Sequence, residues 1–355
     1  MKHLLLLTAF GLMTLPVLAQ IGGDNVYEFV NLSNAARVTA LGGSVITVAD
    51  GDLALGWQNP AALNAEMHHG ISFNHSFFLA GIQHGYASYG YHHKPWRTTF
   101  HGGVQYATYG EFDATDPTGM NTGTFEASEY AIVLGAGHQL YERLSLGANL
   151  KVISSQFEAY NSVGLLGDLS ALYQDTSSNL TLGLVFRNFG GQLSTYRPDN
   201  TEDVPFDVQI GLSKRLRYLP FRFSVIYHNL HRWNILYDDP NSEETVLFIN
   251  EGEEPPSDNV FLDNLARHFI FSGEFLFGKK EVFRVQFGYN HLLNRELSVD
   301  NYRSLAGFSF GFGLKIKRIR VDYGRGVYHL AGGLNHFSIS TNLHEFSSKK
   351  MLDLQ

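Results

Sequence analysis

The stretch GFSFGFGLKI, from Gly307 to Ile316, carries a large apolar residue at every second position from Phe308 onward. Glycine, serine and lysine fill the positions between. Successive side chains of a β-strand point to opposite faces, so this pattern predicts a strand with one apolar face and one small, polar face. A single strand of this kind fits a soluble β-sandwich and a membrane barrel equally well. The recurrence of the pattern along the chain decides between them.

The same alternation recurs from His69 almost to the end of the chain, for example in residues 71–79, 144–151, 283–290 and 319–324. It gives about fourteen strands, an even number that is typical of closed bacterial barrels. The connections are alternately short and long, as in outer-membrane barrels with short periplasmic turns and longer extracellular loops. We therefore predict an all-β protein, a transmembrane antiparallel β-barrel. The expected long loops are residues 113–127, 190–203, 233–267, 293–303 and 328–334.

The composition supports a large folded protein and excludes several functions. Of the 355 residues, 44% are hydrophobic and only 17% are charged, so most of the chain is not disordered. The net charge of -8 shows no excess of basic residues of the kind that binds nucleic acid, so we expect no nucleic-acid partner. The chain has no cysteine, which excludes disulfides, iron–sulfur clusters and thiol nucleophiles. The histidine pairs lack the HExxH spacing of a metal site. The SDN run at residues 257–259 and the SxxK spacing of Ser347 and Lys350 occur in reversed order and without KTG, so we predict a protein that is not an enzyme and has no cofactor.

We expect the chain to divide into four parts. Residues 1–19 have a charged start, an apolar run and small residues at Val17 and Ala19, which predicts a secretory signal peptide. Residues 20–68 lack the alternation and predict one or two short helical turns. This segment is a hatch that fills or caps the periplasmic end of the lumen, or a tether outside the barrel. Residues 69–346 form the barrel, and residues 347–355 are a short tail.

Two groups of residues are candidates for function. Charges of both signs at positions expected to face the lumen can pair and plug the barrel, which we favour, or line a pore. The longest expected loop, residues 233–267, combines acidic residues with an apolar cluster and is the candidate surface for a partner. A solvated loop without a partner is the alternative. The lumen candidates are Lys151, Asp168, Glu274, Arg284, Lys315, Arg320 and Asp322, and the loop candidates are Trp233, Asp238, Asp239, Val260 and Phe261.

Several runs resemble those of the PorV/PorQ family of FadL-like outer-membrane proteins. They are YEFVNL at residues 27–32, AR at 36–37, ALGG at 40–43, NPA at 59–61 and the C-terminal stretch that begins LAGFSFGFGLKI at Leu305. In this order they cover nearly the whole chain after residue 19. One departure is the tail, which extends past Phe346 instead of ending on an aromatic residue. The signature residues in this chain are Phe29, Arg37, Leu41, Gly42, Gly43, Asn59 and Pro60.

The resemblance implies a barrel in the outer membrane of Bacteroidetes that belongs to the type IX secretion system. Proteins of this kind are similar to membrane anchors for a PorZ-like surface protein of the attachment complex, which also contains PorU and PorV. We expect a non-enzymatic component that contacts outer-membrane lipid and anchors such a partner through its extracellular loops. The alternatives are a FadL-like transporter of hydrophobic small molecules and a PorV-like cargo shuttle.

Overall fold

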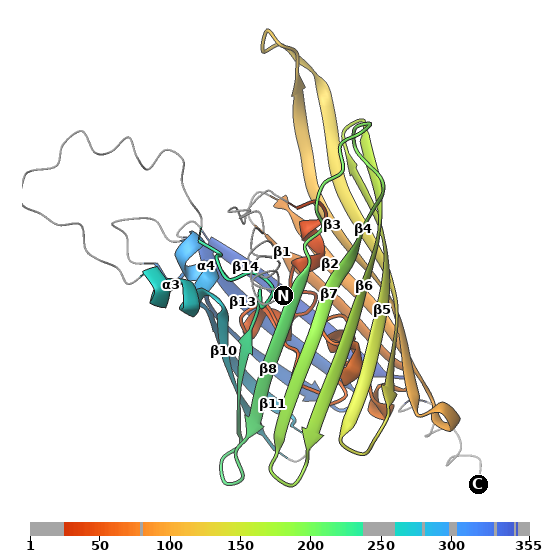
Figure 1. Ribbon diagram of the computed structural model, residues 1–355, viewed down its shortest axis with the longest axis vertical. Coiled ribbons are helices and arrows are strands. Elements are labelled where there is room, and N and C mark those ends of the chain that lie inside the picture. The colour runs from red at the N-terminus through yellow and green to blue at the C-terminus, as the bar shows by residue number, and fades with distance from the viewer. Residues whose placement is uncertain are drawn as a thin grey trace, which may run out of the picture.

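The computed structural model describes residues 25–78, 81–236, 260–278, 281–297, 304–329, 332–343 and 346. Within these ranges, fourteen antiparallel strands form one closed barrel, so the predicted fold is confirmed (Figure 1). Each strand pairs with its neighbours in sequence, and β14 closes the ring on β1, with Gly70 opposite Asn342 and Phe77 opposite Asn335. In the part of the chain that the structure describes, no helix reaches the length and hydropathy needed to cross a membrane.

The strands differ in length, and the longest lie in the first half of the barrel. Their bounds are β1 Gly70–Phe77, β2 Gln83–His93, β3 Thr98–Thr115, β4 Asn121–Gln139, β5 Leu144–Phe157, β6 Tyr160–Asp175, β7 Leu180–Ser194, β8 Asp207–Arg215, β9 Phe221–Tyr227, β10 Phe269–Phe277, β11 Phe283–Asn290, β12 Phe308–Ile316, β13 Ile319–His329 and β14 Gly332–Asn342.

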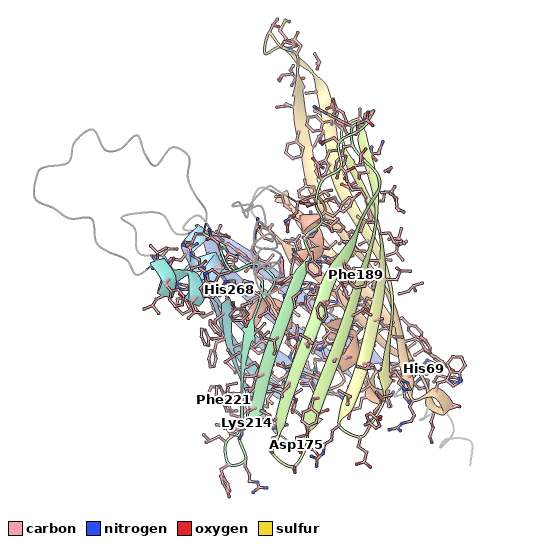
Figure 2. The ribbon with its side chains drawn as sticks, viewed as in Figure 1. His69, Asp175, Phe189, Lys214, Phe221 and His268 are labelled. Carbon is pink, nitrogen blue, oxygen red and sulfur yellow. The ribbon has the colours of Figure 1, made fainter. Side chains whose placement is uncertain are left out.

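The apolar face predicted for residues 307–316 is the outer face of the barrel. Phe310 and Phe312 of β12 are each half exposed, whereas Ser309 and Gly311 are buried inside. Phe310 lies opposite Phe287 of β11, so the aromatic side chains continue from strand to strand across the outer surface. Side chains cover this surface along the whole wall (Figure 2). Such an apolar exterior is what a barrel needs in order to sit in lipid.

We expect Phe312→Arg to destabilise the folded barrel in a bilayer by about 2–4 kcal/mol, because Phe312 lies at the middle of β12 on the lipid-facing side. The matched control Ile316→Arg, at the end of the same strand, costs only about 0–1 kcal/mol. Urea titration of both variants in lipid vesicles measures the two free energies of unfolding. Equal losses would contradict this placement of β12 in the membrane.

Several of the expected long loops are wrong, because they contain regular structure. β3 continues through Thr115 and β4 begins at Asn121, so most of residues 113–127 is a hairpin that projects beyond the other strands (Figure 1). Similarly, β7 extends to Ser194, and β13 and β14 take up most of residues 328–334. Outside the membrane both faces of a strand meet water, so the alternation that marks a strand is lost.

Two further expectations about the connections need correction. Helix α4 (His291–Leu297) occupies the start of the expected loop 293–303, and α3 (Val260–Arg267) ends the expected loop 233–267. The alternation of short and long connections is not strict either. β5 ends at Phe157 and β6 begins at Tyr160, so a tight turn joins them on the long-loop side.

The N-terminal segment, residues 25–69, has five short helices where the sequence indicated one or two. Three of them begin in the same way: the side chains of Asp52, Asn59 and Asn64 each accept a hydrogen bond from the backbone N–H two residues later. These caps satisfy amide groups that a single helical turn leaves free. The helices are η1 Glu28–Asn31, α2 Ala36–Ala40, η2 Leu53–Gly56, η3 Pro60–Ala62 and η4 Ala65–Met67.

This segment lies inside the barrel. The backbone N–H of Ala36 donates to Ser338 Oγ of β14 at 2.8 Å, and that of Ala61 donates to Ser170 Oγ of β6 at 2.9 Å. Because β6 and β14 stand far apart in the ring, the segment spans the lumen between them. Glycines of the wall permit the close approach: a Cβ at Gly324 would lie only 2.0 Å from the Ala36 carbonyl oxygen.

Candidate functional site

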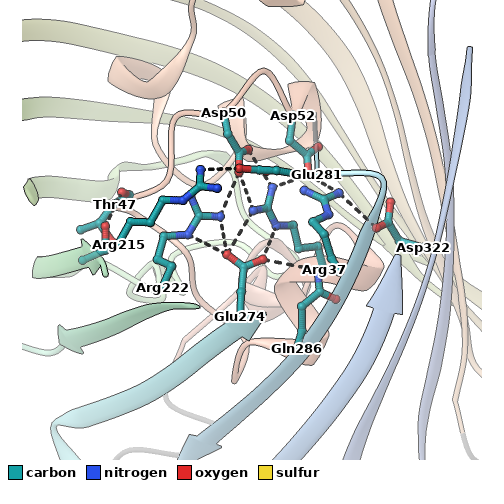
Figure 3. A network of polar contacts seen from close by, with 12 residues as sticks. Arg37, Thr47, Asp50, Asp52, Arg215, Arg222, Glu274, Glu281, Gln286 and Asp322 are labelled. Carbon is teal, nitrogen blue, oxygen red and sulfur yellow. Dashed lines mark hydrogen bonds and ion pairs between the residues drawn. The ribbon is translucent and has the colours of Figure 1, made fainter. Parts of the chain in front are cut away.

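A buried network of charges inside the barrel, which we call the central network, joins the N-terminal segment to the wall (Figure 3). Arg37 of α2 is 1% exposed, and its guanidinium lies 2.7 Å from Asp50 and 3.2 Å from Asp52. The same group donates two hydrogen bonds to Glu274 of β10, at 2.9 and 3.1 Å. Arg37 therefore fastens two parts of the N-terminal segment to one strand of the barrel.

Two arginines of the wall extend this network. Arg222 of β9 contacts Glu274 of β10 and donates to Asp50 at 2.9 Å. Arg284 of β11 donates to Asp322 of β13 at 3.1 Å and lies 4.0 Å from Asp52. Opposite charges are thus matched across four strands and the N-terminal segment, as the cost of burying charges requires.

The electrostatics of the network keep the Asp50 carboxylate charged. Burial opposes ionisation of Asp50, but the positive charges of Arg37 and Arg222 outweigh burial and hold the pKa of the Asp50 carboxyl well below its ordinary value. Asp50 is therefore ionised at neutral pH. Removing one partner from such a network leaves an uncompensated buried charge, which destabilises a protein far more than the loss of a surface ion pair does.

A second buried cluster lies under the neighbouring strands β5, β6 and β7. The Lys151 ammonium lies 2.8 Å from a carboxylate oxygen of Asp168 and donates to Asn188 Oδ1 at 2.8 Å. It also sits 4.6 Å from the centre of the Trp57 ring, a cation–π contact with the N-terminal segment. Lys151 and Asp168 are almost fully buried. The N-terminal segment is therefore held by charge at two separate places.

The seven lumen candidates do not form one site. Glu274, Arg284 and Asp322 belong to the central network, and Lys151 and Asp168 form the second cluster. Lys315 and Arg320 are partly exposed and line a cavity at the short-turn end.

The sequence reasoning missed Asp50, Asp52 and Arg222. Arg222 lies between Phe221 and Phe223, so the alternation that placed Arg284 in the lumen would have placed Arg222 there as well. Asp50 and Asp52 lie in a segment without alternation, where no such signal exists.

The signature residues shape the N-terminal segment. The Phe29 carbonyl accepts a hydrogen bond from Gln105 of β3 at 2.9 Å, and Asn59 donates to the Ile46 carbonyl at 2.6 Å. Gly42, which follows Leu41 at the end of α2, has a φ of 91°, a value that favours glycine. Gly43 (φ 97°) likewise has a left-handed backbone, and Pro60 begins η3. Apart from Arg37, these residues contribute shape and not charge.

Part of the candidate docking loop forms an exposed apolar surface, which we call the α3 patch and define as Trp233, Val260, Phe261 and Leu262. The three residues of α3 are 62%, 59% and 56% exposed, and the Trp233 ring lies 5.3 Å from that of Phe261. Helix α3 stands outside the ring of strands on the long-loop side, beside α4 (Figure 1). Asp238 and Asp239 lie outside the residues that the structure describes.

The α3 patch is held in place by polar contacts. Asn264 donates to the Trp233 carbonyl at 2.7 Å and accepts from the Ile235 N–H at 3.1 Å. Asp263 pairs with Arg267 one turn later at 2.8 Å and with Arg295 of α4 at 2.7 Å. In Figure 2, His268, directly after α3, lies well above Asp175 and Lys214 of the short-turn end. The patch therefore faces the side opposite the short turns.

The described part of the chain shows no metal site. There, no three histidine, aspartate or glutamate side chains gather as a metal site would require. The buried charges of the two clusters, such as Arg37 with Asp50 and Glu274, and Lys151 with Asp168, form ion pairs with one another.

Comparisons with known proteins identify the fold. The sequence matches no family model, and it matches no curated protein. Solved structures do match. The chain is similar to a deltaS2 mutant of the TodX monoaromatic hydrocarbon channel, with a TM-score of 0.51 and 12% identity over 87% of this chain and 97% of that chain. This chain shares its fold with that channel.

Two further structures are also similar. A deltaS2S3 mutant of TodX gives a TM-score of 0.51 and 14% identity over 87% of this chain and 99% of that chain. A FadL homologue from Pseudomonas aeruginosa gives a TM-score of 0.47 and 9% identity, over 87% and 98% of the two chains. At these identities the likeness to TodX concerns the fold alone.

Proposed function

We propose that this chain is a non-enzymatic outer-membrane barrel of the PorV/PorQ type, closest in role to PorQ, that anchors a surface partner of the type IX secretion system. The partner is a PorZ-like protein of the attachment complex, with PorU and PorV as further components. The observation that carries the proposal is the α3 patch, an apolar surface on the long-loop side of a barrel whose outer face is apolar.

The α3 patch has the properties of a protein-binding surface. Its side chains are large, adjacent and exposed, and surface patches of this kind mark interaction sites. Aromatic anchors such as Trp233 and Phe261 dominate the binding energy at protein interfaces. The contacts of Asn264 and Asp263 hold the patch in shape before binding, which reduces the entropy lost when a partner docks.

The interior supports a static anchor. Buried charges tie the N-terminal segment to four strands of the wall. The contacts are Lys151 of β5 with Trp57, Arg222 of β9 with Asp50, Glu274 of β10 with Arg37 and Arg284 of β11 with Asp52. Moving the segment aside would separate Arg37 from Glu274 and Asp50 from Arg222. Separating buried partners in this way is strongly unfavourable. An anchor needs no such movement.

Affinity purification tests the proposal. The tagged chain and two variants are extracted from outer membranes in mild detergent, and co-purifying proteins are quantified by mass spectrometry. We expect a PorZ-like protein in stoichiometric amount, and at least about a tenfold lower recovery with Phe261→Asp, because an aromatic side chain that the partner would cover is replaced by a charge. The control Phe112→Asp alters an exposed aromatic residue of the β3–β4 hairpin. Equal recovery with both variants would contradict docking at the α3 patch.

A second candidate function is the transport of hydrophobic small molecules. It is favoured by an apolar cluster inside the barrel, which contains Tyr27, Phe29, Trp57, Tyr86 and Leu166, and by the fold shared with a hydrocarbon channel. This function predicts saturable binding of a monoaromatic hydrocarbon and purification of the barrel without a protein partner. A PorV-like shuttle would instead be recovered with secreted cargo. The same purification therefore separates the three functions.

A further inference from the structure

A cavity of about 300 Å³ opens at the short-turn end of the barrel, between the N-terminal segment and the wall. The segment contributes residues 50–53 and Glu66 to its lining. The wall contributes the ends of β11 to β14 and of β1, including Arg284, Lys315, Arg318 and Arg320. Four cationic side chains from three strands and one turn therefore meet at a single hollow.

The lining has four cationic side chains and three acidic ones, and one of the cations, Arg284, is also paired with Asp322 outside the lining. Asp50 is already paired with Arg37 and Arg222, and Asp52 is paired with Arg37. Glu66 is exposed to solvent at the edge of the cavity. The cavity therefore keeps a positive field, which favours an anion over a cation or a neutral molecule.

Two guanidinium nitrogens beside the cavity lack an acceptor. Arg284 is 2% exposed, and its Nε–H makes no hydrogen bond to any described residue. The same holds for one terminal nitrogen of Arg320, Nη1, although Nη2 of that residue donates to the Glu281 carbonyl at 3.2 Å. Both nitrogens are closed off from solvent in this structure, so they are unsatisfied donors of cavity-lining residues that an acceptor would reach only after a change of side-chain conformation.

We propose that this cavity binds a phosphate group from the short-turn side of the barrel. Arginine guanidinium groups present a planar fork of N–H donors that matches phosphate oxygens. The volume accommodates a phosphate group and a few waters, since one water takes up about 30 Å³. The phosphate is a free ion or the headgroup of a phospholipid in the adjacent leaflet. This inference does not depend on the anchoring role, because the cavity and the α3 patch lie at opposite ends.

Isothermal titration of the purified, detergent-folded protein with inorganic phosphate tests the proposal. We expect saturable binding to one site, weakened at least about tenfold by Arg320→Gln, which removes donors at the cavity. The matched control Arg143→Gln alters an exposed arginine in another short turn, and its affinity stays unchanged. Because Arg320 lies partly inside the wall, Arg318→Gln, in the turn that lines the cavity, provides a second variant for which folding is secure. A change in electrophoretic mobility between unheated and heated samples confirms that each variant is folded.

Nanodiscs distinguish the two sources of phosphate. Native mass spectrometry shows whether each protein retains phosphatidylglycerol. If the wild type retains this lipid and Arg320→Gln and Arg318→Gln do not, the site binds a lipid headgroup. Binding of inorganic phosphate without lipid retention assigns it to a free ion. The proposal is overturned if neither ligand binds, if acetate binds as tightly as phosphate, or if Arg143→Gln weakens binding as much as the cavity variants do.

Discussion

Arg37→Gln lowers the free energy of unfolding by about 3–5 kcal/mol, the largest effect that we expect from one side chain. The substitution removes the positive charge that faces Asp50, Asp52 and Glu274 and leaves these carboxylates in the interior. Gln can still donate a hydrogen bond, so the loss reports on charge more than on packing. Urea titration in detergent, followed by Trp fluorescence, measures the change.

Arg215→Gln is the matched control for this effect. Arg215 forms an ion pair of 2.7 Å with Glu281, but its side chain is 44% exposed at the short-turn end. An exposed pair contributes only about 0–1 kcal/mol, because water and salt screen it. A loss of similar size in the two variants would show that burial does not set the strength of the central network.

Gly324→Ala displaces α2 from the wall and destabilises the protein by about 1–3 kcal/mol or more. The added Cβ would lie 2.0 Å from the Ala36 carbonyl oxygen, a backbone atom that cannot rotate away. We expect the amides of residues 39–43, which form the hydrogen bonds of this helix and its C-terminal end, to lose protection in hydrogen exchange. Amides in the middle of β5, which this glycine does not approach, keep their protection.

The control for this prediction is Gly191→Ala. Gly191 has no atom within 4 Å of the position of an added Cβ, and its backbone does not require a left-handed φ. Its exchange pattern therefore matches that of the wild type. Unchanged protection of α2 in Gly324→Ala would mean that α2 does not rest against β13 as the structure has it.

The strands were predictable from sequence because every second side chain faces lipid and is apolar, whereas the side chains between them face the lumen and are small or polar. β12 covers Phe308–Ile316, almost the whole stretch on which the prediction was based. The predictions failed where the environment is the same on both sides of a strand. The β3–β4 hairpin is mostly exposed from Glu111 to Glu126, so residues 113–127 show no alternation, and the sequence indicated a loop there.

The partners within the charge network could not be predicted in the same way. Alternation indicates which face a residue of the wall occupies, as for Arg284 and Asp322. It does not indicate which strands face one another across the lumen, because that depends on closure of the ring. Arg37 and Glu274 lie 237 residues apart, and one of them belongs to a segment without periodicity. Contacts of this range follow from the assembled barrel and not from local pattern.

The pairing of β1 with β14 constrains the order of events during folding. Ala36 and Ser338, whose hydrogen bond joins the N-terminal segment to the final strand, are 302 residues apart. Contacts between residues so distant in sequence form slowly. The docking site for α2 is complete only after β13 and β14 have joined the sheet. Helix α2 therefore reaches its buried position only late in folding.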